Sequence, residues 1–434
     1  MRCISSEAAF DEEKVRNAFY SAWSDSYANP SDLDAFYTEP EFDWPVPGPK
    51  VKITSVKPDP MSGSSLWTFS NGFRVIYKNM KTGGRTYWTM ALNGGYGSVE
   101  GLSEGEGAYM SDFIRLCKVG GVDGGTFHDM LLSKGLSFET RVGLTGTLFS
   151  GEAPKDSTEK VIQALVALSS GMTTDNEAFK TYHDNEALRM KLPRDGRAER
   201  MAAIDSIMCP DYAYSWMKTP GKLTYDFPEK ADSFFARQFG KMNDGALVLV
   251  TEVPEADMKK LLLSYAGSFR TTGAAFRRPS IRYQPTAGWS TYTVAGKASS
   301  IDVAMSAVMP LTMDNFMTAA VAVMVLEKSL SAALTDTGMY SEVSYNFVIT
   351  PQERLNLVVS VSPLSGNSYA SHIDPSGPIE ALAVIRSSMQ DLSQTKISDT
   401  VLASCKAYTK SYLASRMNEP GYWLDAIAKR YLDG

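Results

Sequence analysis

The sequence is poor in the side chains that most often bind transition metals or form disulfides. Its 434 residues contain only three histidines and four cysteines. The histidines are His128, His183 and His372. No two of them are four residues apart, so no helix can present a pair on one face. The cysteines (Cys3, Cys117, Cys209, Cys405) show no C-x-x-C spacing, and we expect free thiols, some of them buried.

The sequence also lacks a basic block and a long apolar run. Its net charge is −6, which argues against nucleic acid as a partner. No apolar run reaches the roughly 18 residues that cross a bilayer, so we expect no membrane span, and residues 316–326 are interpreted as part of a buried helix. The acidic first twenty residues are not a secretion signal. The compartment is therefore unknown: periplasmic or secreted if a signal lies upstream, and otherwise cytoplasmic.

The N-terminal region reads as a helix followed by a connector. Residues 11–27 carry apolar side chains every four residues, which predicts a helix with one apolar face. Seven prolines in residues 29–63 prevent long helices there. The connector aromatics (Phe36, Tyr37, Phe42, Trp44) suggest that it lies against a surface.

From Leu66 the pattern is α+β. Residues 66–78 read as a strand, a turn and a strand, and 86–92 as a third strand followed by Gly94-Gly95. Helices are expected near 103–118, 124–134, 157–170, 176–191 and 256–268. Further strands are expected at 136–142, 146–152 and 245–251.

The second part repeats this pattern. Strands are expected at 289–294 and 301–308, a buried helix from Asp314 to about 335, a hairpin at 340–349 and 355–361, and helices at 378–392 and 398–416. Like elements recur at a period of about 220 residues, far longer than that of a solenoid. We therefore expect residues 1–63 to be a helix and linker, 64–272 one α+β domain and 273–434 a second, similar domain, each a mostly antiparallel sheet with helices on it.

These features resemble the insulinase/pitrilysin family of zinc peptidases. The resemblance rests on the Asn71-Gly72 strand pair, the Gly94-Gly95 step, the 150–156 segment before its helix, and Tyr422-Trp423. It covers roughly residues 5–434 and implies the third and fourth domains of such an enzyme. Because the sequence ends at 430–434 in a helical pattern, we expect a fragment of a longer protein.

The resemblance also shows what is missing. Active members carry His-x-x-Glu-His on the helix after the third strand, and the matching positions here are Gly105, Glu106, Tyr109 and Met110 or their neighbours. Glu186 falls in the region of the family's downstream glutamate ligand. The resemblance therefore implies no metal ligands and no catalytic residues in this chain, with zinc confined to a separate catalytic half.

Several weaker candidates have simpler interpretations. Glu104 and Glu106 could form a residual cation site, but an acidic helix N-terminus is favoured. His183 is interpreted as a surface histidine, and His128 and His372 as solvated. The sequence contains no G-K-[ST] phosphate loop.

One substrate-binding candidate remains in the last domain. Active relatives use an arginine and a tyrosine there to bind the substrate backbone. Here Tyr340 stands at the tyrosine position, whereas Thr335 replaces the arginine. Tyr340 is thus a weak substrate-binding candidate, and a core or interface tyrosine is the alternative.

The sequence therefore predicts the non-catalytic half of a pitrilysin-like zinc metallopeptidase, which forms a chamber wall and binds peptide. Its expected partners are a catalytic N-terminal half or subunit and a peptide substrate. Two alternatives stay open. One is a stand-alone pseudopeptidase that pairs with a separate catalytic subunit. The other is a structural subunit without a proteolytic role.

Overall fold

The computed structural model describes residues 12–27, 41–192, 196–208, 217, 219–277, 286–288, 291, 300–335, 337–350, 352–363, 377–394 and 397–433. Contacts divide the chain into two compact units, Met1–Asp43 and Trp44–Gly434. Several expected features lie outside the described residues: Phe36, Tyr37, His372, Cys3, Cys209 and most of the 289–294 strand. Cys117 and Cys405 are free and buried, and burial raises the pKa of the Cys117 thiol.

In the first unit the expected N-terminal helix is present as α1 (Glu12–Tyr27). The rings of Phe19 and Tyr20 meet edge to face, with their centroids 5.9 Å apart. Both side chains are exposed.

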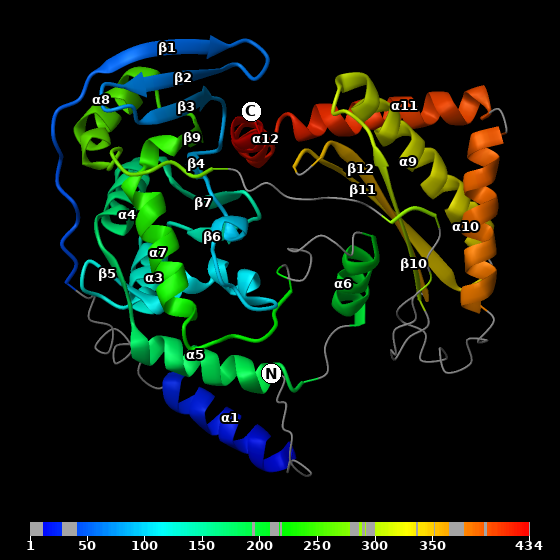
Figure 1. Ribbon diagram of the computed structural model, residues 1–434, viewed down its shortest axis with the longest axis horizontal. Coiled ribbons are helices and arrows are strands. Elements are labelled where there is room, and N and C mark those ends of the chain that lie inside the picture. Colours follow the sequence, from blue (N-terminus) through cyan, green and yellow to red (C-terminus); the bar gives the residue numbers. More distant parts are fainter. Residues whose placement is uncertain are drawn as a thin grey trace. The chain divides into compact units, whose positions relative to one another are not determined.

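The largest element of the second unit is a seven-stranded sheet (Figure 1). Its order is β1 (Ile53–Asp59), β2 (Ser64–Phe69), β3 (Arg74–Asn79), β9 (Gly245–Thr251), β4 (Arg85–Asn93), β7 (Gly146–Pro154) and β6 (Glu139–Val142). Only the β3–β9 pair is parallel. All seven residues of β9 are buried, which explains its continuous apolar sequence. The predicted strands at 66–78, 86–92, 136–142, 146–152 and 245–251 are confirmed, although β6 begins only at Glu139.

Strand β1 lies within the segment that the sequence assigns to the connector. It pairs with β2, although Pro58 has no backbone N–H to donate. An edge strand tolerates proline because one side of its backbone has no partner strand. The preceding residues lie against helices: the Gly48 N–H donates to Ser264 O over 2.9 Å, and Lys160 Nζ lies 4.2 Å from the Trp44 ring centroid. Trp44 thus holds this part of the connector on a surface.

The helices associated with this sheet are α3 (Gly124–Ser133), α4 (Thr158–Ser170), α5 (Asn176–Arg189), α7 (Phe227–Gly240) and α8 (Glu255–Tyr265). Helix α6 (Gly196–Met208) lies instead against residues 301–308, where Arg200 forms an ion pair with Asp302. A short ribbon pairs β5 (Cys117–Val119) with β8 (Met172–Thr174). The sequence pattern did not predict α6 or α7. Helix α7 buries Phe227, Phe234 and Phe235, so it contributes much of the aromatic core.

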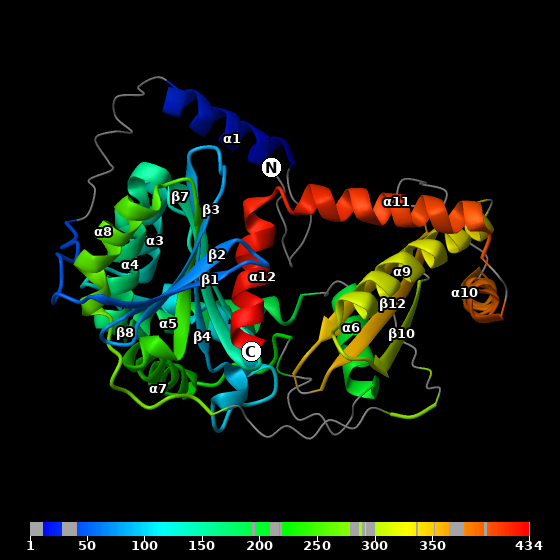
Figure 2. The same ribbon diagram turned by 90° about the horizontal axis from the view of Figure 1, so that it is seen from above.

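Helix α12 (Pro420–Asp433) also packs on the seven-stranded sheet (Figure 2). Its Leu424, Ile427 and Ala428 form one buried cluster with residues of β3, β4 and β9. Arg430 Nη1 lies 2.7 Å from Asp59 Oδ2 at the end of β1. The end of the expected second domain therefore covers the sheet of the first.

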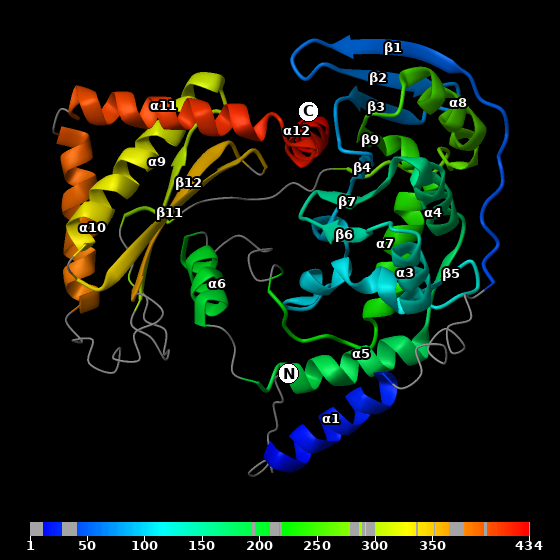
Figure 3. The same ribbon diagram turned by 180° about the vertical axis from the view of Figure 1, so that it is seen from behind.

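The second sheet has three strands in the order β10 (Ile301–Val308), β12 (Arg354–Pro363) and β11 (Met339–Val348). Its helices are α9 (Met313–Leu334), α10 (Gly377–Gln394) and α11 (Asp399–Arg416), and α9 and α10 share its core (Figure 3). The order β10-β12-β11 repeats the order β4-β7-β6 of the large sheet. This repetition supports the duplication, which stays a prediction.

Helix α9 differs from the expected fully buried helix. Leu326, Leu330 and Leu334 lie in the core, whereas Met313 is 69% exposed. One stripe packs on the sheet and the remaining surface is only partly covered. By length and composition alone α9 could span a bilayer, and it is the one such helix among the described residues. A core helix of a soluble protein passes the same test, so the finding is weak evidence of a span.

Candidate functional site

The candidate site lies where β4 ends and the chain turns away from the sheet. Gly94 has a φ of +92°, and a Cβ on it would come within 2.5 Å of the Phe276 ring. A Cβ on Gly95 would come within 2.0 Å of Gly143 O. Glycine at both positions therefore allows the 143–144 turn to approach, and the Tyr96 N–H donates to Gly143 O over 2.9 Å.

The helix predicted for 103–118 is wrong. Its place is taken by two 3₁₀ turns, η2 (Glu106–Ser111) and η3 (Phe113–Leu116), which follow the earlier turn η1 (Tyr96–Ser98). Gly101 and Gly105 adopt φ values of +73° and +79°, which an α-helix cannot contain. The zinc-binding helix implied by the family resemblance is therefore absent from this described segment.

The carboxylate of Glu106 is completely buried and fully engaged. The Ser103 N–H donates to its Oε2 over 2.7 Å, and the Thr224 N–H donates to its Oε1 over 2.9 Å. The Thr224 hydroxyl also donates to Oε1. Lys230 Nζ completes the arrangement at 3.1 Å from Oε2, and its side chain is 14% exposed. Glu106 is thus a structural anion that ties η2 to α7.

The pKa of Lys230 reflects this position. Burial lowers the pKa, but hydrogen bonds and charges from Glu106 and Asp226 outweigh it, so the pKa lies above the usual 10.5. Asp226 Oδ2 lies 3.1 Å from the same ammonium, one helical turn before it. The charge of Lys230 is therefore shared between a buried and an exposed carboxylate.

The other positions matching the lost motif do not fit a metal. Tyr109 and Met110 are buried at 2% and 0% exposure, and the Tyr109 hydroxyl donates to Gly221 O over 3.0 Å. A Cβ on Gly105 would meet Gly221 Cα at 2.4 Å, so the two backbones are in direct contact there. Within the described ranges, no group of three or more His, Cys, Asp and Glu side chains is arranged to hold a metal ion. A zinc ion would have to displace Lys230 and Thr224 from Glu106.

Glu186 lies on α5 and is 6% exposed. Its Oε1 lies 3.2 Å from Arg189 Nη1, while its buried Oε2 has no hydrogen-bond partner among the described residues. His183, predicted to be a surface histidine, is partly buried: its side chain is 15% exposed and its ring stacks on Tyr225 with centroids 4.2 Å apart. Among the described residues, no hydrogen bond links the side chain of His183 or Glu186 to that of Glu106.

Tyr340 lies at the start of β11, opposite Ser362 of β12, and is 43% exposed. Thr335, at the arginine position, donates its hydroxyl to Ser331 O over 2.8 Å and so closes the end of α9. Gly338 between them has a φ of +69°, which suits this tight turn. Exposure leaves Tyr340 accessible, but its substrate-binding role stays a prediction.

The residues that sequence reasoning missed are Lys230 and Thr224. Lys230 is 124 positions from Glu106, and nothing in the spacing connects them. The one local signal is Asp226, four residues before Lys230 on a helix, which indicates a surface pair and no more.

Comparison with protein-family models and with curated proteins finds no match to this sequence. Solved structures do match. The periplasmic protease PqqL from Escherichia coli has a TM-score of 0.70 at 17% identity, over 92% of this chain and 44% of that one. The ferredoxin protease FusC, solved in complex with Arabidopsis ferredoxin, has a TM-score of 0.65 at 16% identity, over 91% and 42%.

A third neighbour is the inactive domain of an M16 peptidase from Pseudomonas fluorescens, with a TM-score of 0.66 at 10% identity over 85% of this chain and 88% of that one. The chain thus spans less than half the length of the first two neighbours and nearly all of the third. At these identities the likeness concerns the fold. The chain therefore has the insulinase/pitrilysin-like fold of M16 peptidases.

Proposed function

We propose that this chain is the non-catalytic half of an M16-type metallopeptidase, forming a wall of its closed chamber and contributing contacts to the peptide. The observation that carries the proposal is the Glu106 arrangement. The segment that would carry the zinc motif instead forms 3₁₀ turns, and its one buried carboxylate is neutralised by Lys230. This region stabilises the domain and supplies no open metal position, whereas a catalytic zinc needs one.

The comparisons support the proposal in two ways. One neighbour with nearly the same extent is itself an inactive M16 domain, and the chain covers 44% of the protease PqqL. A half of this kind needs a catalytic half that supplies the zinc and the general base. Because FusC is solved with a protein, ferredoxin, we extend the proposed ligands to peptide segments of proteins.

The test is reconstitution. The full chain is mixed with the catalytic half encoded upstream in the same reading frame or, failing that, with a separately encoded catalytic homologue. Peptide cleavage should appear in the mixture and not in either component alone. Equal cleavage by the catalytic component without this chain would refute the proposal. If a separately encoded homologue cleaves peptide only when this chain is added, the chain is better described as a stand-alone subunit than as half of a single-chain enzyme.

A zinc measurement on the isolated chain accompanies this test. Elemental analysis after dialysis should find no stoichiometric zinc, because Glu106 is already bound to Lys230. One zinc per chain that disappears in both His183→Ala and Glu186→Ala would contradict the assignment, whereas Glu139→Gln, an exposed control, should change nothing.

A further inference from the structure

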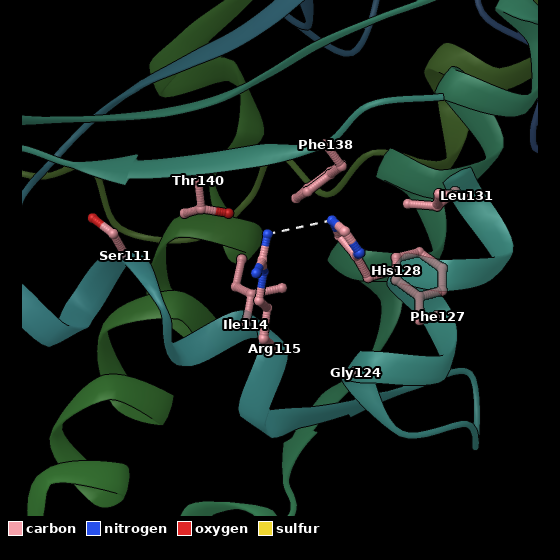
Figure 4. A pocket seen from close by; sticks show the side chains of 9 residues that line it. All are labelled: Ser111, Ile114, Arg115, Gly124, Phe127, His128, Leu131, Phe138 and Thr140. Carbon is pink, nitrogen blue, oxygen red and sulfur yellow. Dashed lines mark hydrogen bonds between the residues drawn. The ribbon is translucent and has the colours of Figure 1, made fainter. Parts of the chain in front are cut away.

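A hollow lies between edge strand β6, helix α3 and the turn η3 (Figure 4). Its empty space of about 350 Å³ includes open solvent, so the hollow is a shallow surface feature. Phe127 and Phe138 contribute apolar walls, while Arg115, His128 and Thr140 bring polar atoms to it. It is separate from the Glu106 cluster, which uses none of these side chains.

Arg115 brings a positive charge to this hollow. Its Nη2 lies 3.3 Å from His128 Nε2. Because a guanidinium can only donate, Nε2 is the acceptor and the imidazole orients Arg115 without neutralising it. Within the described part of the chain no carboxylate forms an ion pair with Arg115, whereas Arg141 on the neighbouring strand is paired with Glu139 at 3.1 Å. The hollow therefore holds an oriented cation that forms no ion pair with a described carboxylate.

The strand beside the hollow has an open edge. Ser137 N–H donates to Glu152 O and Gly143 N–H to Gly146 O, so alternate residues from 137 to 143 face β7. The N–H and C=O groups of Phe138 and Thr140 then point away from the sheet, and among the described residues no hydrogen bond to them is found. The edge ends at Val142, whose N–H donates to Ser111 Oγ over 2.9 Å.

We propose that an extended peptide segment adds to β6 as a further strand and places an acidic side chain in the hollow against Arg115. The backbone groups of Phe138 and Thr140 supply the strand pairing, and this mode needs no particular sequence. A residue opposite Thr140 projects on the same face as Thr140, toward the hollow. Arg115 then selects a carboxylate through a charge-assisted hydrogen bond.

This inference rests on the proposed function, because it gives a place and a chemistry to the peptide contacts of the non-catalytic half. It assigns the preference to an acidic side chain within an extended segment whose backbone pairs with Phe138 and Thr140.

Binding is measured by fluorescence anisotropy on the full chain, without a catalytic half. Two labelled peptides with blocked ends, rich in β-branched residues, differ only in a central Glu or Gln. The Glu peptide should bind about tenfold more tightly. Arg115→Gln should remove that difference, while Arg141→Gln, on the opposite face of the same strand, should preserve it.

The edge is tested by Thr140→Pro, which removes an outward N–H and leaves the bonds to β7 intact, with Thr140→Val as the matched control. Proline should abolish binding of both peptides and valine should not. A Glu peptide N-methylated on alternate amides should also fail to bind, which tests the pairing without altering the protein. Equal binding of the Glu and Gln peptides to the unmodified chain, or equal effects of the two arginine substitutions, would overturn the inference. Reconstitution of cleavage is a separate measurement, so failure of one leaves the other interpretable.

Discussion

Replacing Lys230 with methionine should destabilise the seven-stranded part of the chain by about 3–5 kcal/mol. The substitution removes the cation but leaves the Glu106 carboxylate at 0% side-chain exposure, held by Ser103 and Thr224. Removing one partner of a buried pair is costly because the remaining charge is uncompensated. Glu106→Gln in the same chain should restore part of the loss, so the two substitutions should couple by about 2 kcal/mol or more.

The assay is urea unfolding followed by tryptophan fluorescence. Two of the seven tryptophans, Trp67 and Trp88, are buried at 0% and 1% exposure in β2 and β4, so their share of the signal reports on this sheet. The matched control is the Glu139–Arg141 pair, whose side chains are 59% and 62% exposed. A double-mutant cycle on this pair, with each residue changed to glutamine singly and together, should give a coupling free energy of about 0.2–1 kcal/mol.

The pH dependence has a definite sign. Since the pKa of Lys230 is raised above 10.5 in the folded chain, its contribution is fully present below that pH and is lost as pH rises through the folded value. The stability difference between the natural chain and Lys230→Met should therefore narrow only above pH 10.5. If the Glu106–Lys230 coupling is no larger than that of Glu139–Arg141, the structural role assigned to Glu106 is refuted.

Two further predictions concern stability. Ile427→Ala, in the cluster that α12 forms on the sheet, should cost about 2–4 kcal/mol in urea unfolding, whereas Lys429→Ala on its exposed side should cost less than about 0.5. Asp123 caps α3, accepting from Thr126 N–H over 2.9 Å, and Asp123→Ala should cost about 1 kcal/mol at pH 7. Because hydrogen bonds from Thr126 lower the pKa of Asp123 below 3.8, that difference should vanish as pH falls through the folded value; a constant difference would contradict the capping role.

Much of the fold was readable from local pattern. Strands β2, β3, β4 and β9 and helix α4 follow from apolar periodicity, because each buries one face or both. The expected 103–118 helix failed because Gly101 and Gly105 take positive φ, which composition hints at but cannot decide. Strand β1 was missed because Pro58 and the surrounding prolines resemble a connector, and only its pairing with β2 makes it a strand.

The candidate site was less accessible to sequence reasoning. The absence of the zinc motif was readable, since no histidine stands near residues 105–110. What replaced it was not. The partners of Glu106 come from residues 224 and 230, and only the folded chain brings them there. The binding site proposed at Arg115 likewise depends on which residues of β6 direct their backbone N–H and C=O groups away from β7. The sequence of a four-residue strand does not indicate this.

The position of α12 has a consequence for biosynthesis. Every strand of the seven-stranded sheet is translated before residue 252, whereas the helix that covers part of that sheet begins at Pro420. While the intervening residues are being made, the nascent chain presents the apolar surface around Ala91 and Val248 uncovered. Such surface invites aggregation or chaperone binding during synthesis. A ribosome stalled before α12 should therefore hold a sheet that still needs protection, and translation of the last helix should end that need.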